Sequence, residues 1–299
     1  MTSAAATSND VQQEASADRT SHVGACWTLY ALTLRQHLHG KRWIALVLLF
    51  MLPAGLAILI RNTGPGVPST FLEFVLSWML IPQALLPLVA LLYASGIIQD
   101  EQEDQTITYL LIRPLPKWLL YVVKMAATWT TTVLLVIVLT ILTYVAIYAR
   151  SGAGLADGFQ RCRKASEIHS LAVVAYSSIF GLLGLLTKRS LVVGMIYTVV
   201  VEGLLANLPL SVRMGTVIYY CRIIAYRTLD FAVLWPRGKT DDVAAVAWFL
   251  DPVKDPQLTE HPQLSTCVCV LVITSLVCTA IAAWLCSQRE FHVKTPEKE

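Results

Sequence analysis

Charged side chains are scarce in this sequence. They make up 14% of its 299 residues, and 56% of the residues are hydrophobic, whereas soluble domains carry about 25% charged residues. Most apolar residues fall in runs long enough to cross a bilayer, which argues against a water-soluble core. The sequence therefore predicts an all-α, polytopic integral membrane protein.

Motifs of several other protein classes are also absent. The net charge of +3 is scattered, without the dense basic stripe that neutralises phosphates, so nucleic acid is not expected as a partner. No His-Glu-x-x-His pairing indicates a metal enzyme, and no serine, histidine and acid arrangement indicates a hydrolase. Cys267 and Cys269 have no second pair nearby, and core packing is their expected role. We therefore expect no catalytic residue, no metal and no cofactor in this chain.

Long apolar runs are what the sequence does contain, each of about 18 residues or more, the length that crosses a bilayer as a helix. They predict six spanning helices, at about 43–60, 74–98, 118–149, 170–187, 191–210 and 264–287. Residues 23–290 would form one transmembrane domain, followed by a cytoplasmic tail at 291–299. Residues 1–22 have no apolar core, so they are expected to be a disordered cytoplasmic tail and not a signal peptide.

Local features predict the shape of several spans. Pro82 and Pro87 predict a kinked second span. Only Thr187-Lys188-Arg189-Ser190 separates the fourth and fifth spans, which predicts a tight helical hairpin. In the third span, Lys124 lies near enough to the end to snorkel. Charges interrupt residues 211–262, so we expect an interfacial or re-entrant helical element there.

The distribution of basic residues favours cytoplasmic termini. With six spans both termini share one side, and loops on the cytoplasmic side are enriched in Lys and Arg. The basic residues on the side of the termini are Arg35, Lys41, Arg42, Arg113, Lys117, Lys188, Arg189 and Arg289. The opposing residues are Arg150, Arg161, Arg163 and Lys164, in a predicted loop after the third span that this orientation places outside.

An amphipathic stretch precedes the first span. Trp27, Tyr30, Leu34 and Leu38 recur at helical spacing, while Arg35 lies off that stripe. This pattern predicts an N-terminal helix along the inner interface, either as a simple anchor or as a contact for a partner.

The segment from Gln99 to Lys117 is the most informative. Acids crowd its first turn, where the positive end of a helix dipole favours them, and Pro114 disfavours helix at Arg113. A short helix of about three turns is therefore expected between the second and third spans. A solvated acidic connector and a helix that transmits force from a soluble partner both fit this composition.

The residues of this segment resemble the permease subunit of ABC-2-type transporters. The likeness lies in the acids from Glu101 to Asp104, then Thr106-Ile107, Tyr109-Leu110-Leu111, Arg113-Pro114 and Lys117, with Lys124 beyond. Gln105 stands where that family usually has glycine, and Ile107 where it often has leucine. A second likeness is Glu202-Gly203-Leu204-Leu205-Ala206-Asn207-Leu208-Pro209, which is similar to the Glu-containing fifth helix of bacterial members.

The resemblance implies a dimer, either a homodimer or a heterodimer with a second permease, in which each subunit seats this segment on a separate cytoplasmic ATP-binding subunit. The residues that it marks for ATPase coupling are Glu101, Glu103, Asp104, Thr106, Tyr109, Arg113 and Lys117. ATP would be bound by the partner, since the sequence has no G-x-x-x-x-G-K-[ST] loop to hold nucleotide phosphates.

Glu202 lies near the middle of an apolar run, where a carboxylate must face protein, water or a partner charge, or else be protonated. Two roles stay open: translocation or gating, and a structural acid that bonds neighbouring helices where Asn207 and Pro209 unwind the helix.

Three functions are consistent with this reading. The first is a transporter permease in the plasma membrane, expected to be an exporter because the family that it resembles is dominated by exporters. The second is an ABC-type complex that remodels or releases another membrane protein without moving solute. The third, an intramembrane enzyme, requires paired ionisable residues on facing spans, whereas Glu202 stands almost alone in the predicted spans.

Overall fold

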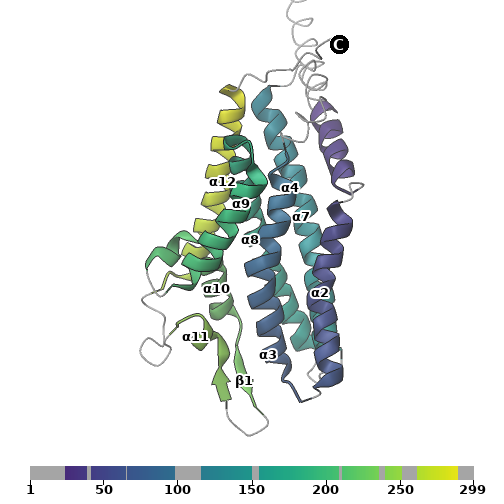
Figure 1. Ribbon diagram of the computed structural model, residues 1–299, viewed down its shortest axis with the longest axis vertical. Coiled ribbons are helices and arrows are strands. Elements are labelled where there is room, and N and C mark those ends of the chain that lie inside the picture. The colour runs from purple at the N-terminus through teal and green to yellow at the C-terminus, as the bar shows by residue number, and fades with distance from the viewer. Residues whose placement is uncertain are drawn as a thin grey trace, which may run out of the picture.

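The apolar runs form long helices that pack side by side (Figure 1). The computed structural model describes residues 24–38, 42–64, 66–97, 116–149, 155–208, 211–235, 240–250 and 261–288. In these residues six helical segments are long and apolar enough to cross a membrane, which confirms the predicted all-α, polytopic architecture. The predicted tails at 1–22 and 291–299 lie outside the described residues.

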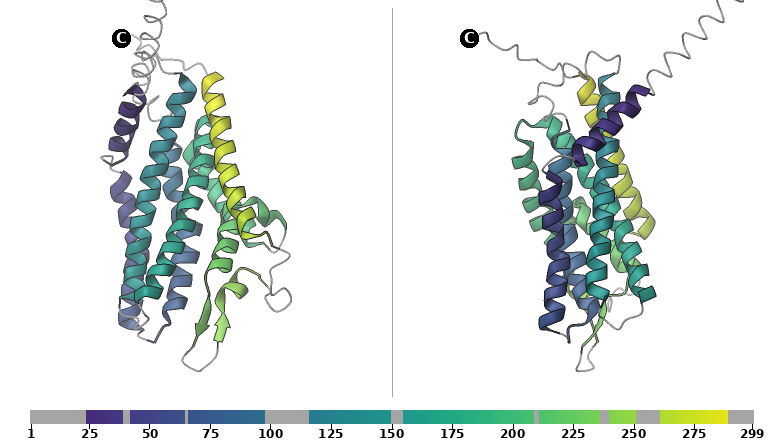
Figure 2. Two further views of the ribbon diagram at one scale, coloured as in Figure 1. Left: turned by 180° about the vertical axis from the view of Figure 1, so that it is seen from behind. Right: turned by 90° about the vertical axis from the view of Figure 1, so that its right-hand side faces the viewer.

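The first three spans run alternately along the bundle. An N-terminal helix covers residues 24–38 and precedes the first span, α2 (Arg42–Thr63). The second span consists of α3 (Ser69–Glu73), η1 (Phe74–Leu85) and α4 (Leu86–Ala94), and the third is α7 (Lys117–Tyr148). We call the end near helix 24–38 and the start of α7 the proximal end, and the end where α2 meets α3 the distal end (Figures 1 and 2).

The second span departs from α geometry where its prolines lie. Pro82 is inside η1, whose turns are π-helical, and Pro87 is at the beginning of α4. Because proline removes a backbone donor and frees a carbonyl of the preceding turn, the wider π-helical turns occur where the helix must adjust.

The fourth span, α8 (Leu155–Leu186), lies at the centre of the bundle and packs against α4, α7, α10 and α12. Close approach of its neighbours requires glycine, because a Cβ at Gly184 would lie 2.6 Å from the carbonyl oxygen of Ser95. This helix begins well before the predicted start near 170, so Arg161, Arg163 and Lys164 are helical and the predicted loop at these positions is wrong. Charged residues were taken to end the apolar run, but two of them are satisfied by partners inside the protein, as shown below.

The fifth span ends before it reaches the distal end (Figure 1). It begins with α9 (Ser190–Tyr197), right after the short turn that follows α8, and continues through η2 (Thr198–Leu204), which is π-helical, and η3 (Leu205–Asn207), which is a 3₁₀ turn. After η4 (Ser211–Gly215), the helix α10 (Val217–Thr228) continues toward the distal end. With 12 residues, α10 is too short to cross a bilayer.

A small distal unit follows α10 and departs from the all-helical pattern. Strands β1 (Ala232–Leu234) and β2 (Thr240–Asp242) pair antiparallel, with Val233 opposite Asp241, and lead into α11 (Val243–Ala247). The last span, α12 (Leu264–Gln288), returns to the proximal end (Figure 2).

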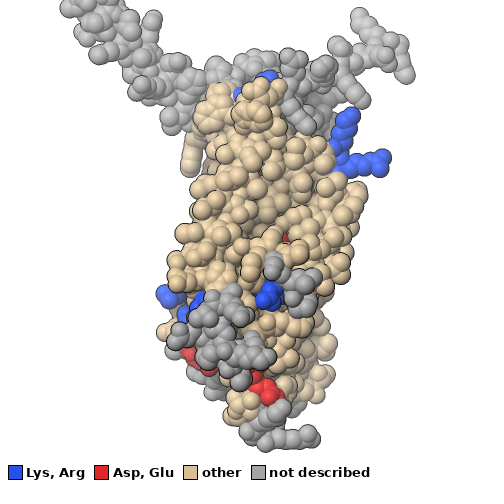
Figure 3. Space-filling model, turned by 90° about the vertical axis from the view of Figure 1, so that its left-hand side faces the viewer, with Lys and Arg blue, Asp and Glu red and all other residues tan. Residues whose placement is uncertain are grey.

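Outer surfaces and interior fit a lipid-embedded bundle. On the face in Figure 3, mainly uncharged side chains form a broad band, with basic side chains above it and both signs of charge below. Lys124 does not snorkel: it is 3% exposed, and its Nζ donates to the carbonyl of Ile97 at 3.1 Å, so the third span holds the end of the second.

Candidate functional sites at two buried carboxylates

Most of the predicted coupling residues fall outside the part of the chain that the structure describes. These are Glu101, Glu103, Asp104, Thr106, Tyr109 and Arg113. Lys117 is described and is the first residue of α7, where its carbonyl accepts a hydrogen bond from Cys286 Sγ at 3.5 Å. The start of the third span is thus tied to the end of the last one, while the coupling role of the segment stays a prediction.

Glu202, the second predicted site residue, is fully buried in the π-helical turns of η2. Its carboxylate accepts hydrogen bonds from the hydroxyls of Tyr176 at 2.8 Å and Tyr197 at 3.2 Å. It also accepts from the backbone N–H groups of Val217 at 3.0 Å and Ile218 at 3.1 Å. Both carboxylate oxygens therefore have two donors each.

The two backbone donors are the first residues of α10, so Glu202 caps that helix from a distant part of the sequence. The residue before α10, Thr216, makes no side-chain capping bond of its own. A helix N-terminus carries unsatisfied N–H groups and partial positive charge, which a carboxylate neutralises. The buried acid thus supplies what the local sequence of α10 lacks.

Arg222 makes the reverse contact, from α10 back to the end of the fifth helix. Its guanidinium donates to the carbonyl of Ala206 at 3.3 Å and to Asn207 Oδ1 at 2.9 Å, and the residue is 6% exposed. Burial lowers the pKa of Arg222 from its ordinary value, and the nearby Tyr176 and Glu202 oppose that shift. An acid of the fifth helix therefore binds the positive end of α10, and a base of α10 binds the negative end of the fifth helix.

These reciprocal contacts between the fifth span and α10 explain how the apolar fifth span accommodates Glu202 although it ends before the distal end. It corresponds to the structural role left open for Glu202, with Asn207 at the unwound end as expected. A translocation or gating role is neither required nor tested by these contacts, and it stays a prediction.

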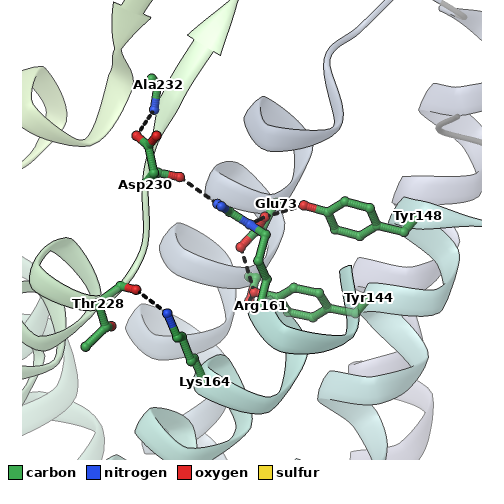
Figure 4. A network of polar contacts seen from close by, with 9 residues as sticks. Glu73, Tyr144, Tyr148, Arg161, Lys164, Thr228, Asp230 and Ala232 are labelled. Atoms are coloured by element: carbon green, nitrogen blue, oxygen red, sulfur yellow. Dashed lines mark hydrogen bonds and ion pairs between the residues drawn. The ribbon is translucent and has the colours of Figure 1, made fainter. Parts of the chain in front are cut away.

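A second buried carboxylate, Glu73, lies near the distal end and joins three spans (Figure 4). Its side chain is 0% exposed, and Arg161 Nε of α8 lies 2.6 Å from Oε2. The hydroxyls of two α7 residues also donate to it, Tyr144 to Oε1 at 2.9 Å and Tyr148 to Oε2 at 2.6 Å. Ser77 donates to the Tyr144 hydroxyl at 3.4 Å. The second, third and fourth spans therefore meet at one ion pair.

Arg161 and a second cation of α8, Lys164, also bind the chain where it leaves α10. Arg161 Nη2 donates to the carbonyl of Asp230 at 2.7 Å, and Lys164 Nζ donates to the carbonyl of Thr228 at 2.6 Å (Figure 4). Asp230 in turn accepts from the backbone N–H of Ala232 at 3.0 Å, at the start of β1. One guanidinium thus bridges the spans and the distal unit.

The sequence analysis missed Glu73, because it lies one residue before the predicted second span and was taken as the boundary of an apolar run. Two signals pointed to it. Tyr144 and Tyr148 are four residues apart and so share a face of the third span, and Arg161 is placed on the facing helix once α8 is extended. The premise that Glu202 stands almost alone was therefore wrong: a facing ion pair exists, although its atoms are occupied by one another.

An apolar groove of about 550 Å³ lies between the second and fifth spans. Its lining comes from η1, α4, α9 and η2, and includes Gln83, Ala84, Leu88, Leu91, Met195, Thr198, Val199, Val200, Gly203 and Leu204. Only Gln83 and Thr198 bring polar side chains to it, so the groove suits apolar groups. Within the described residues no cluster of three or more His, Cys, Asp or Glu side chains has the arrangement of a metal site.

Comparison with protein families gives a match to the family described as ABC-2 family transporter protein, over residues 38–203. Comparison with curated proteins gives no match. The matched region covers more than half of the chain and contains the first four spans and most of the fifth. The family consists of membrane transport subunits without an ATPase site of their own. The chain therefore belongs to the ABC-2 family of transporter proteins and is a multi-pass permease of the ABC transporter type.

Proposed function

We propose that this chain is the permease of an ABC exporter in the plasma membrane, that it works as a dimer, and that separate ATPase subunits drive it. The observation that carries the proposal is family membership together with six spans and the absence of a nucleotide-binding loop from the sequence. Export, not import, follows from the resemblance to a family dominated by exporters. ATP is then the ligand of the partner subunit.

The proximal end is built to pass on force applied between the second and third spans. Lys124 of α7 binds the carbonyl of Ile97, the last described residue before the predicted coupling helix. His37 of the N-terminal helix contacts Tyr93 edge to face at 4.8 Å, and its Nε2 lies 3.3 Å from Thr128 Oγ1. A push on residues 99–117 would therefore reach the interfacial helix and both spans together.

A second copy is the proposed cover for the fifth span. Only 22% of the residues in the most apolar stretch of the fifth span are buried, compared with 67% in the fourth span. Its exposed apolar residues include Leu191, Val192, Met195, Ile196, Val199, Val200 and Leu204. Several of them line the groove shared with the second span, so packing of two copies along this face would enclose an apolar pathway between them.

The contacts at the distal end support cytoplasmic termini. Arg161 and Lys164, which opposed that orientation, bind Glu73 and backbone carbonyls of the protein itself. At the proximal end, Lys188 and Arg189 are exposed in the turn between α8 and α9. The rule that basic residues gather on the cytoplasmic side concerns exposed residues of the loops. Lys188 and Arg189, which are exposed, therefore count more toward the orientation than Arg161 and Lys164, which are bound inside the protein.

Co-purification with a soluble P-loop ATPase, followed by charge reversal in the predicted coupling helix, tests the proposal. We expect Glu101→Lys and Glu103→Lys to abolish stimulation of ATP hydrolysis, because each would place a cation where the partner's groove accommodates an acid. The matched control is Glu167→Lys, which reverses an exposed acid of α8 whose described partner is Arg163 at 3.7 Å. The control should leave stimulation unchanged.

Three outcomes separate the alternatives. Stimulated hydrolysis that survives both reversals would overturn the coupling role of the segment. Hydrolysis that depends on Glu101 and Glu103 but moves no solute into sealed vesicles would favour a remodelling or assembly complex. Vectorial movement of solute coupled to hydrolysis supports the permease.

A further inference from the structure

The distal unit covers the ends of the second and fourth spans. We define the lid as residues 228–235 and 240–250, which contain β1, β2 and α11. Its buried side chains include Phe231, Val233, Ala244, Ala245 and Trp248, all at most 5% exposed. A unit this small cannot bury so much apolar surface alone, so its stability depends on the helices beneath it.

Aromatic contacts dock the lid on the second span. Phe231 packs edge to face on Phe74 at 5.8 Å and on Trp78 at 5.9 Å between ring centroids. Trp248 packs on Phe74 at 5.4 Å. These rings bury apolar area, and the two Phe231 pairs have the edge-to-face geometry that aromatic pairs prefer.

Directional contacts come from α8. Arg161 and Lys164 bind the carbonyls of Asp230 and Thr228, at the point where the chain leaves α10 for the lid (Figure 4). Arg161 binds both partners at once, Nε to the Glu73 carboxylate and Nη2 to the Asp230 carbonyl, so Glu73 holds the guanidinium in the orientation that reaches Asp230. The lid is therefore fastened through an ion pair that belongs to the spans.

We propose that Glu73 and Arg161 form a latch that holds the lid closed on the distal ends of the second and fourth spans. Buried ion pairs add little net stability compared with apolar packing, and their best-attested use is to fix one arrangement among alternatives. Here the arrangement fixed is the seating of residues 228–235, and opening the lid requires the guanidinium to leave the Asp230 carbonyl. This proposal does not depend on the ATPase partner or on the direction of transport.

Hydrogen exchange of the full chain in lipid nanodiscs tests the latch. The main variant is the double substitution Glu73→Gln with Arg161→Gln, which removes both charges and so leaves neither buried alone. We expect amides of the lid to exchange roughly ten- to a hundredfold faster, the range that loss of a hydrogen bond from a charged donor gives, with α7 and α12 unchanged.

Two further variants keep the test decisive. Arg161→Lys keeps the positive charge, and a single ammonium cannot hold the carboxylate and the carbonyl in the fork geometry of Arg161, so lid exchange should rise several-fold even if the double variant fails to fold. The matched control is Arg163→Gln, because that arginine makes an exposed ion pair with Glu167 on the same helix. It should leave lid exchange as in the wild type.

The latch is overturned if lid protection is unchanged in both Arg161 variants. It is also overturned if α7 and α12 gain exchange by the same factor as the lid, because the pair would then support the whole fold and not the seating of one unit. Faster exchange confined to the lid supports the proposal.

Discussion

Glu73 and Glu202 are two fully buried carboxylates, and the protein stabilises them in the apolar interior in different ways. Glu73 has a guanidinium at 2.6 Å and two tyrosine hydroxyls, so its charge is compensated by a cation. Among the described residues, the donors to Glu202 are all neutral: two tyrosine hydroxyls and two backbone N–H groups at the start of α10. One site depends on a counter-charge and the other on a helix end.

The difference shows that an acid in a spanning segment does not by itself mark a transport pathway. At Glu202 the carboxylate oxygens that a substrate or ion would need are occupied by two tyrosine hydroxyls and by the start of α10, with Arg222 making the reciprocal contact. At Glu73 they are occupied by three spans and, through Arg161, by the lid. Removal of a single group should therefore cost a different amount of unfolding free energy at each of the two sites.

The largest effect is expected at the charged site. Arg161→Met leaves Glu73 as an uncompensated buried carboxylate, and we expect a loss of about 3–5 kcal/mol in unfolding free energy, measured by thermal or denaturant unfolding of the purified protein in detergent. The reference is the double variant Glu73→Gln with Arg161→Met, which removes the stranded charge. Equal stability of the single and double variants would mean that the cation does not compensate Glu73.

A smaller effect is expected at the neutral site. Glu202→Gln keeps an acceptor for α10 but removes the negative charge and places an NH₂ group against donors, so we expect a loss of about 1–2 kcal/mol. If capping is the whole role of Glu202, ATP hydrolysis stimulated in the complex should stay close to wild type. A stable Glu202→Gln protein that has lost this stimulation would instead favour gating.

The sequence predicted the spans better than it predicted their charged partners. Apolar length is a local property, and it gave six spans and the short turn between α8 and α9. It also predicted a kink at Pro82, and π-helical turns are found there. The partners of Glu73 and Glu202, by contrast, come from segments far away in the chain, and nothing local indicates that Val217 needs a cap or that Arg161 faces Glu73.

The charged residues before the fourth span led to a wrong prediction of where that helix begins. Treating Arg161, Arg163 and Lys164 as loop residues assumed that cations end a membrane helix, which holds only when no internal acceptor is available. Two of the three find acceptors, and the third, Arg163, is exposed beside Glu167 one turn away. The family resemblance added the coupling role of the short helix predicted between the second and third spans, and most of the residues on which that role rests lie outside the described part of the chain.

A third carboxylate, Asp242, extends the comparison to a partly buried setting and gives the smallest expected effect. Like Glu202 it caps a helix, accepting from the N–H groups of Ala244 at 3.1 Å and Ala245 at 3.0 Å, and it also accepts from the Tyr226 hydroxyl at 2.7 Å. Tyr226→Phe should loosen the lid by about 1 kcal/mol, since the bond is partly open to solvent. Amide exchange in β2 and α11 measures this change.

The pH dependence of the same bond has a defined sign. Burial, followed by the hydrogen bond to Asp242 and its negative charge, raises the pKa of the Tyr226 phenol above its ordinary value of 10.0. The protonated phenol is therefore favoured in the folded lid, and its contribution is fully present below pH 10 and is lost as pH rises through the raised pKa. Exchange of the lid should accelerate above about pH 10, beyond the intrinsic rise with pH. Tyr226→Phe should lack this extra acceleration, because it has no phenol to ionise, and an identical pH profile in both proteins would show that the Tyr226–Asp242 bond does not hold the lid.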